Sequence, residues 1–175
     1  MEKKKPCMAN QIYIKQATKE DIPNIHSVIY NVWPQTYAPI ISQDQIDFML
    51  DMMYSESSLI HQIEIEKCVF LIASLEGKPV GISSISCVEP EKFKLNKLYV
   101  DLAFQGYGIG KLLLHESIQR AITAKAKAMT LNVNRFNKAK AFYESQGFEI
   151  IDEVDVSIGN GFYMNDFIME KKLIG

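Results

Sequence analysis

The chain contains short segments in which apolar and polar residues alternate and longer segments in which apolar residues recur at helical spacing. This combination indicates a mixed α/β domain. Residues 11–17 alternate as a half-buried strand does. Thr18 suits the N-cap of a following helix, with Glu20 and Asp21 in the favourable first turn. For the first part of the chain we predict a strand at 11–17 and helices at 18–33, 42–54 and 58–66, with Pro34 and Pro39 breaking the chain after the first helix.

The second part of the chain is predicted to consist mainly of strands. A Glu-Gly-Lys-Pro turn at residues 76–79 separates two apolar runs, as in a β-hairpin. Gly147 follows a helical segment, where glycine commonly caps a helix C-terminus. The predicted elements are strands at 69–75, 80–88 and 93–101, a helix at 108–127, a strand at 129–133, a helix at 138–146, and strands at 148–156 and 162–173. This order indicates a mixed α/β domain around one central sheet.

Composition is that of an ordinary globular protein. The chain has 175 residues, of which 47% are hydrophobic and 23% charged, which argues against disorder and against a fibrous repeat. We predict one domain over residues 11–175, preceded by a basic tail at 1–10. The apolar runs are too short to cross a bilayer, and polar residues follow the basic start where a signal peptide has its apolar stretch. We therefore expect a cytoplasmic protein that does not bind membranes.

The three cysteines, Cys7, Cys68 and Cys87, are odd in number and lack metal-site spacing. They predict neither a disulfide framework nor a bound metal, and they fit a reducing cytoplasm. Cys68 and Cys87 lie in apolar, strand-like runs, so we expect both in the core.

The distribution of charge is more informative than its sum. The net charge of −2 disfavours a general nucleic-acid-binding protein. Residues 20–66 hold eight acidic residues and no Lys or Arg, whereas residues 67–151 hold twelve Lys or Arg against seven acidic residues. One part of the chain should attract cations and the other anions.

The most informative segment runs from Leu98 to Lys111, where a strand leads through a glycine-rich turn into a long amphipathic helix. The first turn of a helix leaves backbone N–H groups unpaired and carries partial positive charge. Glycines let a pyrophosphate approach several of these groups. A P-loop would need Ser or Thr after Gly110-Lys111, and a dinucleotide fingerprint would need Gly in place of Lys111. A glycine turn that merely starts a helix remains as the alternative.

Two motifs resemble those of the GNAT superfamily, the acetyl-CoA-dependent N-acetyltransferases. Gln105, Gly108 and Gly110 fit the family's pattern of Gln or Arg, two residues, Gly, one residue, then Gly or Ala. They follow a strand similar to the family's Leu-Tyr-Val-Asp. Residues 139–148, AKAFYESQGF, resemble the family's Ala-x-x-Phe-Tyr-x-x-x-Gly-Phe. The likeness in element order spans about residues 11–173.

The resemblance implies a fold and a co-substrate. The fold would be GNAT-like, with a central, mostly antiparallel sheet of six to seven strands, a splayed middle and helices on both faces. Acetyl-CoA would lay its pantetheine arm along the splayed fourth strand and its pyrophosphate on the glycine turn. No metal is implied. The residues implied to bind acetyl-CoA are Leu98, Tyr99, Val100, Gln105, Gly106, Tyr107, Gly108, Ile109, Gly110, Lys111 and Asn137.

Two parts of this cofactor site are less firmly tied to the family pattern. Asn137 stands in for an asparagine that family members usually carry one position earlier, where this chain has Phe136. Additional phosphate charge would be met by Lys111, Arg135, Lys138 and Lys140, although a solvated basic face explains the last three equally well.

Acetyl transfer to an amine needs a neutral nitrogen, a polarised thioester carbonyl and a proton for the departing thiolate. By the resemblance, Tyr143 is the general acid, and the backbone N–H of Val100, freed by the strand's bulge, polarises the carbonyl. A phenol of pKa about 10 is a weaker acid than a thiol of pKa about 8.5. Full proton transfer is therefore uphill unless the site lowers the phenol pKa, and a hydrogen bond that strengthens with charge on sulfur is the alternative. The alternative is that Tyr143 has no catalytic role and is an aromatic residue that packs in the core.

No general base is predicted. Many relatives carry an acid on the fourth strand, but residues 95–98 offer none. Four further titratable residues are as well explained by a surface or helix position: His26, His61, Glu64 and Glu91.

We expect an N-acetyltransferase that moves the acetyl group to a primary amine by direct attack in a ternary complex. The acidic segment 20–66 favours a cationic acceptor (a polyamine, small amine or peptide amine), with Trp33, Tyr37 and Tyr54 as aromatic surface. Acids that only solvate two helices are the alternative. Residues 160–167 also resemble the tails of bacterial polyamine-type members.

Two rival hypotheses stay open, a non-catalytic acyl-CoA-binding sensor and a nucleotide-binding protein without acyl chemistry. Family members often form homodimers, and the sequence leaves that state open.

Overall fold

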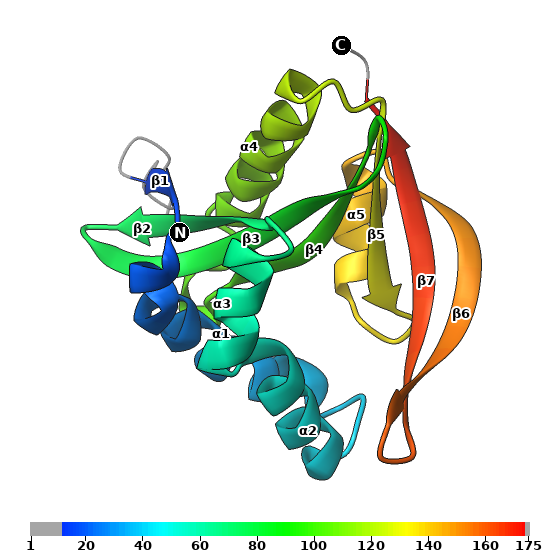
Figure 1. Cartoon of the computed structure of the whole chain (residues 1–175). Coiled ribbons are helices and arrows are strands. Elements are labelled where there is room, and N and C mark those ends of the chain that lie inside the picture. The colour runs from blue at the N-terminus through cyan, green and yellow to red at the C-terminus, as the bar shows by residue number, and fades with distance from the viewer. Residues whose placement is uncertain (1–11, 174–175) are drawn as a thin grey trace, which may run out of the picture.

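The computed structural model describes residues 12–173, and its centre is a seven-stranded sheet in the order β1-β2-β3-β4-β5-β7-β6 (Figure 1). Neighbouring strands are antiparallel except β4 and β5, which are parallel. The predicted mixed α/β fold with a mostly antiparallel sheet is thus confirmed. The strands are β1 Ile12–Gln16, β2 Val69–Leu75, β3 Lys78–Glu89, β4 Lys92–Val100, β5 Ala128–Asn134, β6 Glu149–Gly159 and β7 Phe162–Lys172.

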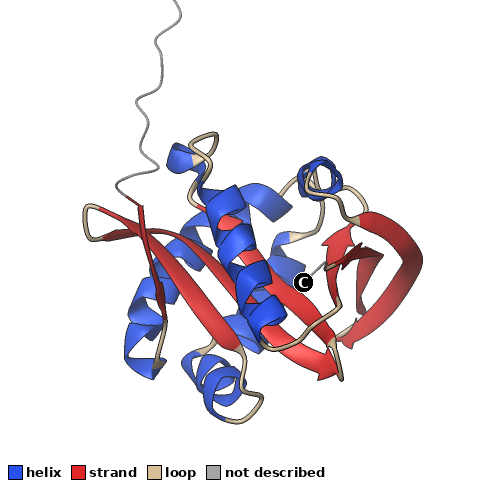
Figure 2. Cartoon of the chain, turned by 90° about the horizontal axis from the view of Figure 1, so that it is seen from above, coloured by secondary structure: helices blue, strands red, loops and turns tan. Residues whose placement is uncertain are grey.

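Helices cover both faces of the sheet because its central strands are apolar on both sides. In β2, Phe70 and Ile72 pack beneath the first three helices, whereas Leu71 and Ala73 pack beneath α4. Figure 2 shows α4 lying across the sheet. The helices are α1 Ile22–Tyr37, α2 Gln43–Tyr54, α3 Glu56–Glu64, α4 Ile109–Thr123 and α5 Ala139–Ser145, with 3-10 turns at Lys19–Asp21 and Leu102–Phe104.

Local sequence explains most helix boundaries. The Ser42 hydroxyl accepts a hydrogen bond from the Gln45 N–H at 3.2 Å and so caps α2. The Asp21 carboxylate accepts from the Thr18 N–H at 3.1 Å where the chain turns into α1. Gly147 follows α5 with φ of 85°, the left-handed conformation expected of a C-terminal glycine cap.

Two sequence predictions are wrong. Pro34 does not end the first helix, because only one backbone hydrogen bond is lost and the buried side chains of Val32 and Trp33 hold the turn against the core. The helix continues to Tyr37, and the Ala38 N–H donates to the Pro34 oxygen at 3.0 Å. Cys87 is exposed rather than in the core, since the buried part of β3 ends at Ile85.

Cys68 is buried as predicted. The predicted tail at 1–10 and Cys7 lie outside the described residues. Within residues 12–173, no helix combines the length and the apolar character needed to cross a bilayer.

Candidate active site

The sheet opens between β4 and β5. These strands pair only where Lys92–Leu95 lies beside Ala128–Leu131. Beyond that point β4 stays with β3 and β5 stays with β7, so the two inner edges diverge and leave a splayed middle (Figure 1). Divergence leaves backbone groups on both edges without a strand partner.

The backbone of Leu98 and Val100 faces this opening. The Asp101 N–H donates to the Val80 oxygen on β3 at 2.9 Å. In an antiparallel ladder, alternate residues direct their backbone groups to the same neighbour. Tyr99 therefore pairs with β3, whereas Leu98 and Val100 face away from it. The divergence of β5, not a local bulge, frees Val100, because the nearer of the two irregularities in the β3–β4 register falls at Asn96.

The glycine turn joins this edge to α4. Gly106 and Gly108 have φ of 81° and 82°, values that non-glycine residues rarely adopt. Gly108 is the N-cap of α4, and a Cβ added there would meet no atom within 4 Å. The first N–H groups of α4 have no helical partner and adjoin open space, so the turn combines positive dipole and access, as an anion site requires.

A cavity of about 760 Å³ runs along these groups. Of the twelve residues predicted to bind acetyl-CoA or act on it, eleven line this cavity. Tyr107 does not, because its side chain packs half-buried against the apolar cluster beneath α4. The lining residues are Leu98, Tyr99, Val100, Gln105, Gly106, Gly108, Ile109, Gly110, Lys111, Asn137 and Tyr143.

Tyr143 lies on α5 at the wall of this cavity and is 8% exposed. Its ring packs edge-on against Phe142 and Phe148, with centroid separations of 5.4 and 5.9 Å. Burial raises the pKa of Tyr143 above its usual value. The site thus makes the phenol a weaker acid, which favours a hydrogen bond to sulfur over full proton transfer.

The other predicted phosphate contacts divide into two groups. Lys111 and Lys138 line the cavity. Arg135 instead pairs with Glu153 and Asp155 of β6, and Lys140 pairs with Glu144. Because Arg135 and Lys140 are held in these three ion pairs, Lys111 and Lys138 are the two lysines that remain for an anionic ligand.

Asn137 is partly committed to local structure. Its side-chain oxygen accepts a hydrogen bond from the Ala139 N–H at 2.9 Å at the start of α5. The Asn137 side chain also hydrogen-bonds to Tyr37 across the cavity that both residues line. The neighbouring Phe136 also lines the cavity and is 75% exposed.

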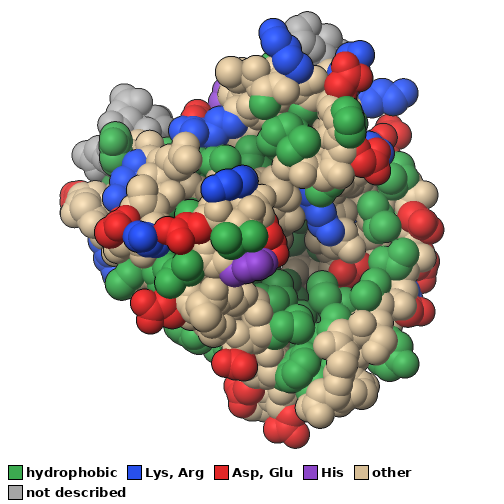
Figure 3. All heavy atoms as spheres, in the orientation of Figure 1, with side chains coloured by type: hydrophobic (Ala, Val, Ile, Leu, Met, Phe, Trp, Pro, Cys, Tyr) green, Lys and Arg blue, Asp and Glu red, His purple; other side chains and the backbone are tan. Residues whose placement is uncertain are grey.

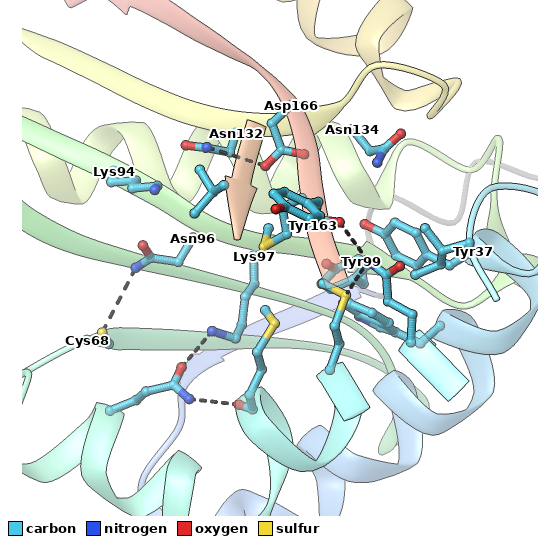
Figure 4. A pocket seen from close by; sticks show the side chains of 18 of the residues that line it. Tyr37, Cys68, Lys94, Asn96, Lys97, Tyr99, Asn132, Asn134, Tyr163 and Asp166 are labelled. Atoms are coloured by element: carbon cyan, nitrogen blue, oxygen red, sulfur yellow. Dashed lines mark hydrogen bonds between the residues drawn. The ribbon is translucent and has the colours of Figure 1, made fainter. Parts of the chain in front are cut away.

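A second cavity of about 400 Å³ lies on the α1–α3 side of the sheet. Figure 3 shows the surface hollowed between this helical part and strands β5–β7. Its walls come from helices α1–α3, the segment between α3 and β2, and strands β3–β7, and Figure 4 shows the polar side chains that converge on it. The two cavities meet, since five residues line both: Tyr37, Asn96, Lys97, Tyr99 and Asn132.

Sequence reasoning predicted part of this second cavity. Trp33 and Tyr37 line it, while Tyr54 is fully buried behind it. Of the eight acidic residues in segment 20–66, Glu66 lines it and the other seven do not. Asp44, Asp47 and Asp51 are exposed on α2, so these acids solvate the helices, as the alternative explanation held.

The charges inside the second cavity come mostly from residues that the sequence did not single out. Lys94 and Lys97 of β4 and Asp166 of β7 line it together with Glu66. Lys97 is 7% exposed, and burial lowers its pKa from 10.5 to about 8. Its Nζ donates to Gln62 Oε1 at 2.6 Å and lies over the rings of Tyr54 and Phe70, at 5.3 and 5.4 Å from their centroids.

Gln62 is oriented by its own contacts. Its amide N–H₂ donates to the Met53 oxygen at 2.8 Å and to the Ser58 hydroxyl at 3.0 Å, so its oxygen is left to accept from Lys97. Burial also raises the pKa of Tyr37 and of Tyr99, and both phenols keep their protons where the cavities join.

None of the four weakly supported base candidates lines either cavity. His26 contacts the backbone oxygen of Tyr54 at 2.7 Å, and His61 lies 3.5 Å from Glu66. Glu64 pairs with Lys19, and Glu91 pairs with Lys127. Within residues 12–173, no three His, Cys, Asp or Glu side chains are grouped to hold a metal ion.

Comparison with known proteins agrees with this geometry. The domain model described as acetyltransferase (GNAT) domain matches residues 37–171. The curated spermidine N(1)-acetyltransferase of Thermoplasma acidophilum is 28% identical over 166 residues, covering 92% of this chain and 97% of the relative.

Solved structures match over nearly the whole chain. The crystal structure of PaiA N-acetyltransferase from Thermoplasma acidophilum in complex with coenzyme A superposes with a TM-score of 0.80 at 28% identity, covering 92% of this chain and 98% of that one. A GCN5-related N-acetyltransferase from Rhodopseudomonas palustris has a TM-score of 0.78 at 22% identity, covering 92% and 95%, a likeness of fold. The family model spans well over half of the chain, and this chain therefore belongs to the GNAT family of N-acetyltransferases and is an acyltransferase.

Proposed function

We propose that this protein transfers the acetyl group of acetyl-CoA to a primary amine by direct attack in a ternary complex. The observation that carries the proposal is the meeting of two cavities, which share five lining residues, at the splay between β4 and β5. A thioester lying in the first cavity and an amine entering from the second would reach each other there, so no covalent enzyme intermediate is needed.

The residues of the first cavity fit coenzyme A. The unpaired backbone groups of Leu98 and Val100 would pair with the amides of the pantetheine arm, as an added strand pairs with a sheet edge. The N–H groups after Gly108 would bind the pyrophosphate, with Lys111 and Lys138 adding charge. The Thermoplasma acidophilum relative crystallised with coenzyme A supports this assignment.

Catalysis would use groups at the junction. The Val100 N–H would donate to the thioester oxygen and stabilise the negative charge that develops on it. Tyr143 would donate a hydrogen bond to the departing sulfur. The acceptor is proposed to be a cationic amine, which the relative named spermidine N(1)-acetyltransferase supports.

The test is acetylation of butylamine, 1,4-diaminobutane, spermidine and lysine, with glycerol as a neutral acceptor, followed by mass spectrometry. We expect mono-acetylated amines and free coenzyme A. Tyr143→Phe should slow turnover by about 10- to 1000-fold while leaving coenzyme A affinity within about twofold. Binding of coenzyme A without turnover of any amine would refute the enzyme and support the sensor.

A further inference from the structure

Asp166 is a buried carboxylate at the wall of the second cavity. It lies on β7 opposite Asn134 of β5, so both side chains and that of Asn132 project from the same face of the sheet. It is 3% exposed and lines the cavity. Figure 4 shows Asp166 and Asn132 together at one side of the cavity, whereas the Lys97 side chain extends away from them toward Gln62.

Asp166 has few partners for a buried carboxylate. Within the described residues, the Asp166 carboxylate accepts one side-chain hydrogen bond, from the Asn132 amide at 3.4 Å. A carboxylate offers about four lone-pair positions, and a buried one is costly without compensating hydrogen bonds or a cation.

The cations near Asp166 do not supply that compensation. Arg135 is held by Glu153 and Asp155 of β6, and Lys94 of β4 forms no ion pair with Asp166 within 4 Å. Burial raises the pKa of Asp166, although Asn132, Lys94 and Arg135 act in the opposite direction. Tyr37 of α1 is the other titratable group whose charge interacts with it.

Asn132 connects this carboxylate to the reaction site. It touches Asp166 and also lines both cavities. An amine bound to Asp166 would therefore lie beside a residue shared by both cavities, next to the splay where the thioester is proposed to lie.

We propose that Asp166 binds the ammonium group of the acceptor and takes its proton, which makes it a catalytic residue of the reaction inferred above. This inference rests on the proposed function. An N–H bond of the ammonium breaks and its proton passes to a carboxylate oxygen of Asp166. The freed electron pair forms the C–N bond, the C–S bond breaks, and the sulfur departs as a thiolate. A second proton leaves the nitrogen, the thiolate gains one, and Asp166 returns its proton to solvent, so one proton is released per turnover.

The experiment compares wild type with Asp166→Asn, an isosteric change that removes the charge. Acetylation of butylamine and spermidine is measured from pH 5 to 9, and butylamine binding to the coenzyme A-loaded protein is measured by calorimetry. We expect kcat/KM for both amines to fall about 100-fold or more, and the loss of activity toward low pH that Asp166 protonation causes in wild type to be absent. Coenzyme A affinity should be unchanged, and the melting temperature should not fall, because the variant removes a buried charge.

Two control variants separate this role from a general effect of charge. Asp152→Asn makes the same change at an exposed position on β6 and should leave kcat/KM within about twofold. Glu66→Gln removes one charge from the wall between α3 and β2 and should cost at least tenfold less than Asp166→Asn.

The outcomes distinguish the inference from the function. Wild-type activity with an equally active Asp166→Asn would overturn the role of Asp166 and leave the acetyltransferase intact. Absence of amine turnover in wild type would refute the proposed function, and in that case equal butylamine binding by wild type and Asp166→Asn would overturn the docking site as well.

Discussion

Lys97 gives a prediction about stability that does not depend on the acceptor. It is 7% exposed, and burial lowers its pKa from 10.5 to about 8. Below about pH 8 the lysine is charged in both folded and unfolded chains, and the cost of burying the charge is fully present. Between about pH 8 and 10.5 the folded protein releases the proton that the unfolded chain still holds, so rising pH favours the folded state.

The magnitude follows from the two pKa values. Their difference, at about 1.4 kcal/mol per pKa unit, corresponds to about 3 kcal/mol. From pH 7 to pH 10 the free energy of unfolding of wild type should therefore rise by about 2–3 kcal/mol relative to Lys97→Met. The variant also leaves Gln62 Oε1 without the donor that lies 2.6 Å away, a cost of about 1–3 kcal/mol. Because that cost is the same at each pH, the slope isolates the lysine.

The assay is urea unfolding of both proteins at pH 7, 8, 9 and 10, followed by the fluorescence of Trp33, the single, fully buried tryptophan. Lys172→Met, at an exposed position on β7, is the control for the loss of a surface lysine. The pH dependence of its free energy of unfolding is subtracted from that of Lys97→Met. If the free energies of unfolding of wild type and Lys97→Met differ by an amount that stays constant within about 0.5 kcal/mol from pH 7 to 10, the claim that Lys97 is a buried, destabilising ammonium is refuted.

Two glycine variants, with a third as a control, test how the cofactor cavity is built. Gly81→Ala would place its Cβ 3.0 Å from Leu113 Cδ1 and 3.1 Å from the backbone oxygen of Tyr99. Overpacking should therefore lower the free energy of unfolding, measured in urea titrations, by about 1–3 kcal/mol. An unchanged free energy of unfolding would mean that α4 shifts freely. Gly108→Ala and Gly77→Ala, at φ of 82° and 78° with open space around both, should each cost about 1 kcal/mol. Calorimetry should show coenzyme A affinity falling at least tenfold in Gly108→Ala alone, and equal losses in both would contradict the placement of the pyrophosphate.

Local sequence signals predicted most of the fold. Period-two and helical apolar patterns predicted the strands and helices, and the Gln105 to Gly110 motif predicted a turn, in which Gly106 and Gly108 have left-handed backbone conformations. Pro34 failed as a helix terminator because tertiary packing of α1 outweighed one lost hydrogen bond. Cys87 failed as a core residue because apolar neighbours in sequence do not reveal where the covering helices end.

The polar residues of the second cavity were harder to predict because distant segments bring them together. Lys97 meets Gln62 across 35 positions, and Asp166 meets Asn132 across 34. The β5–β7 register that aligns Asp166 with Asn134 is fixed by the whole sheet. The one available signal for Asp166 was a carboxylate inside an apolar strand, between Met164 and Ile168.

The central claim is that the splay between β4 and β5, together with the first turn of α4, binds coenzyme A. Calorimetric titration of the purified protein with coenzyme A, ATP and NAD tests it directly. Saturable one-to-one binding of coenzyme A, with none of ATP or NAD, is the predicted result. Heats of binding for ATP or NAD equal to those for coenzyme A, or none for coenzyme A, would contradict it.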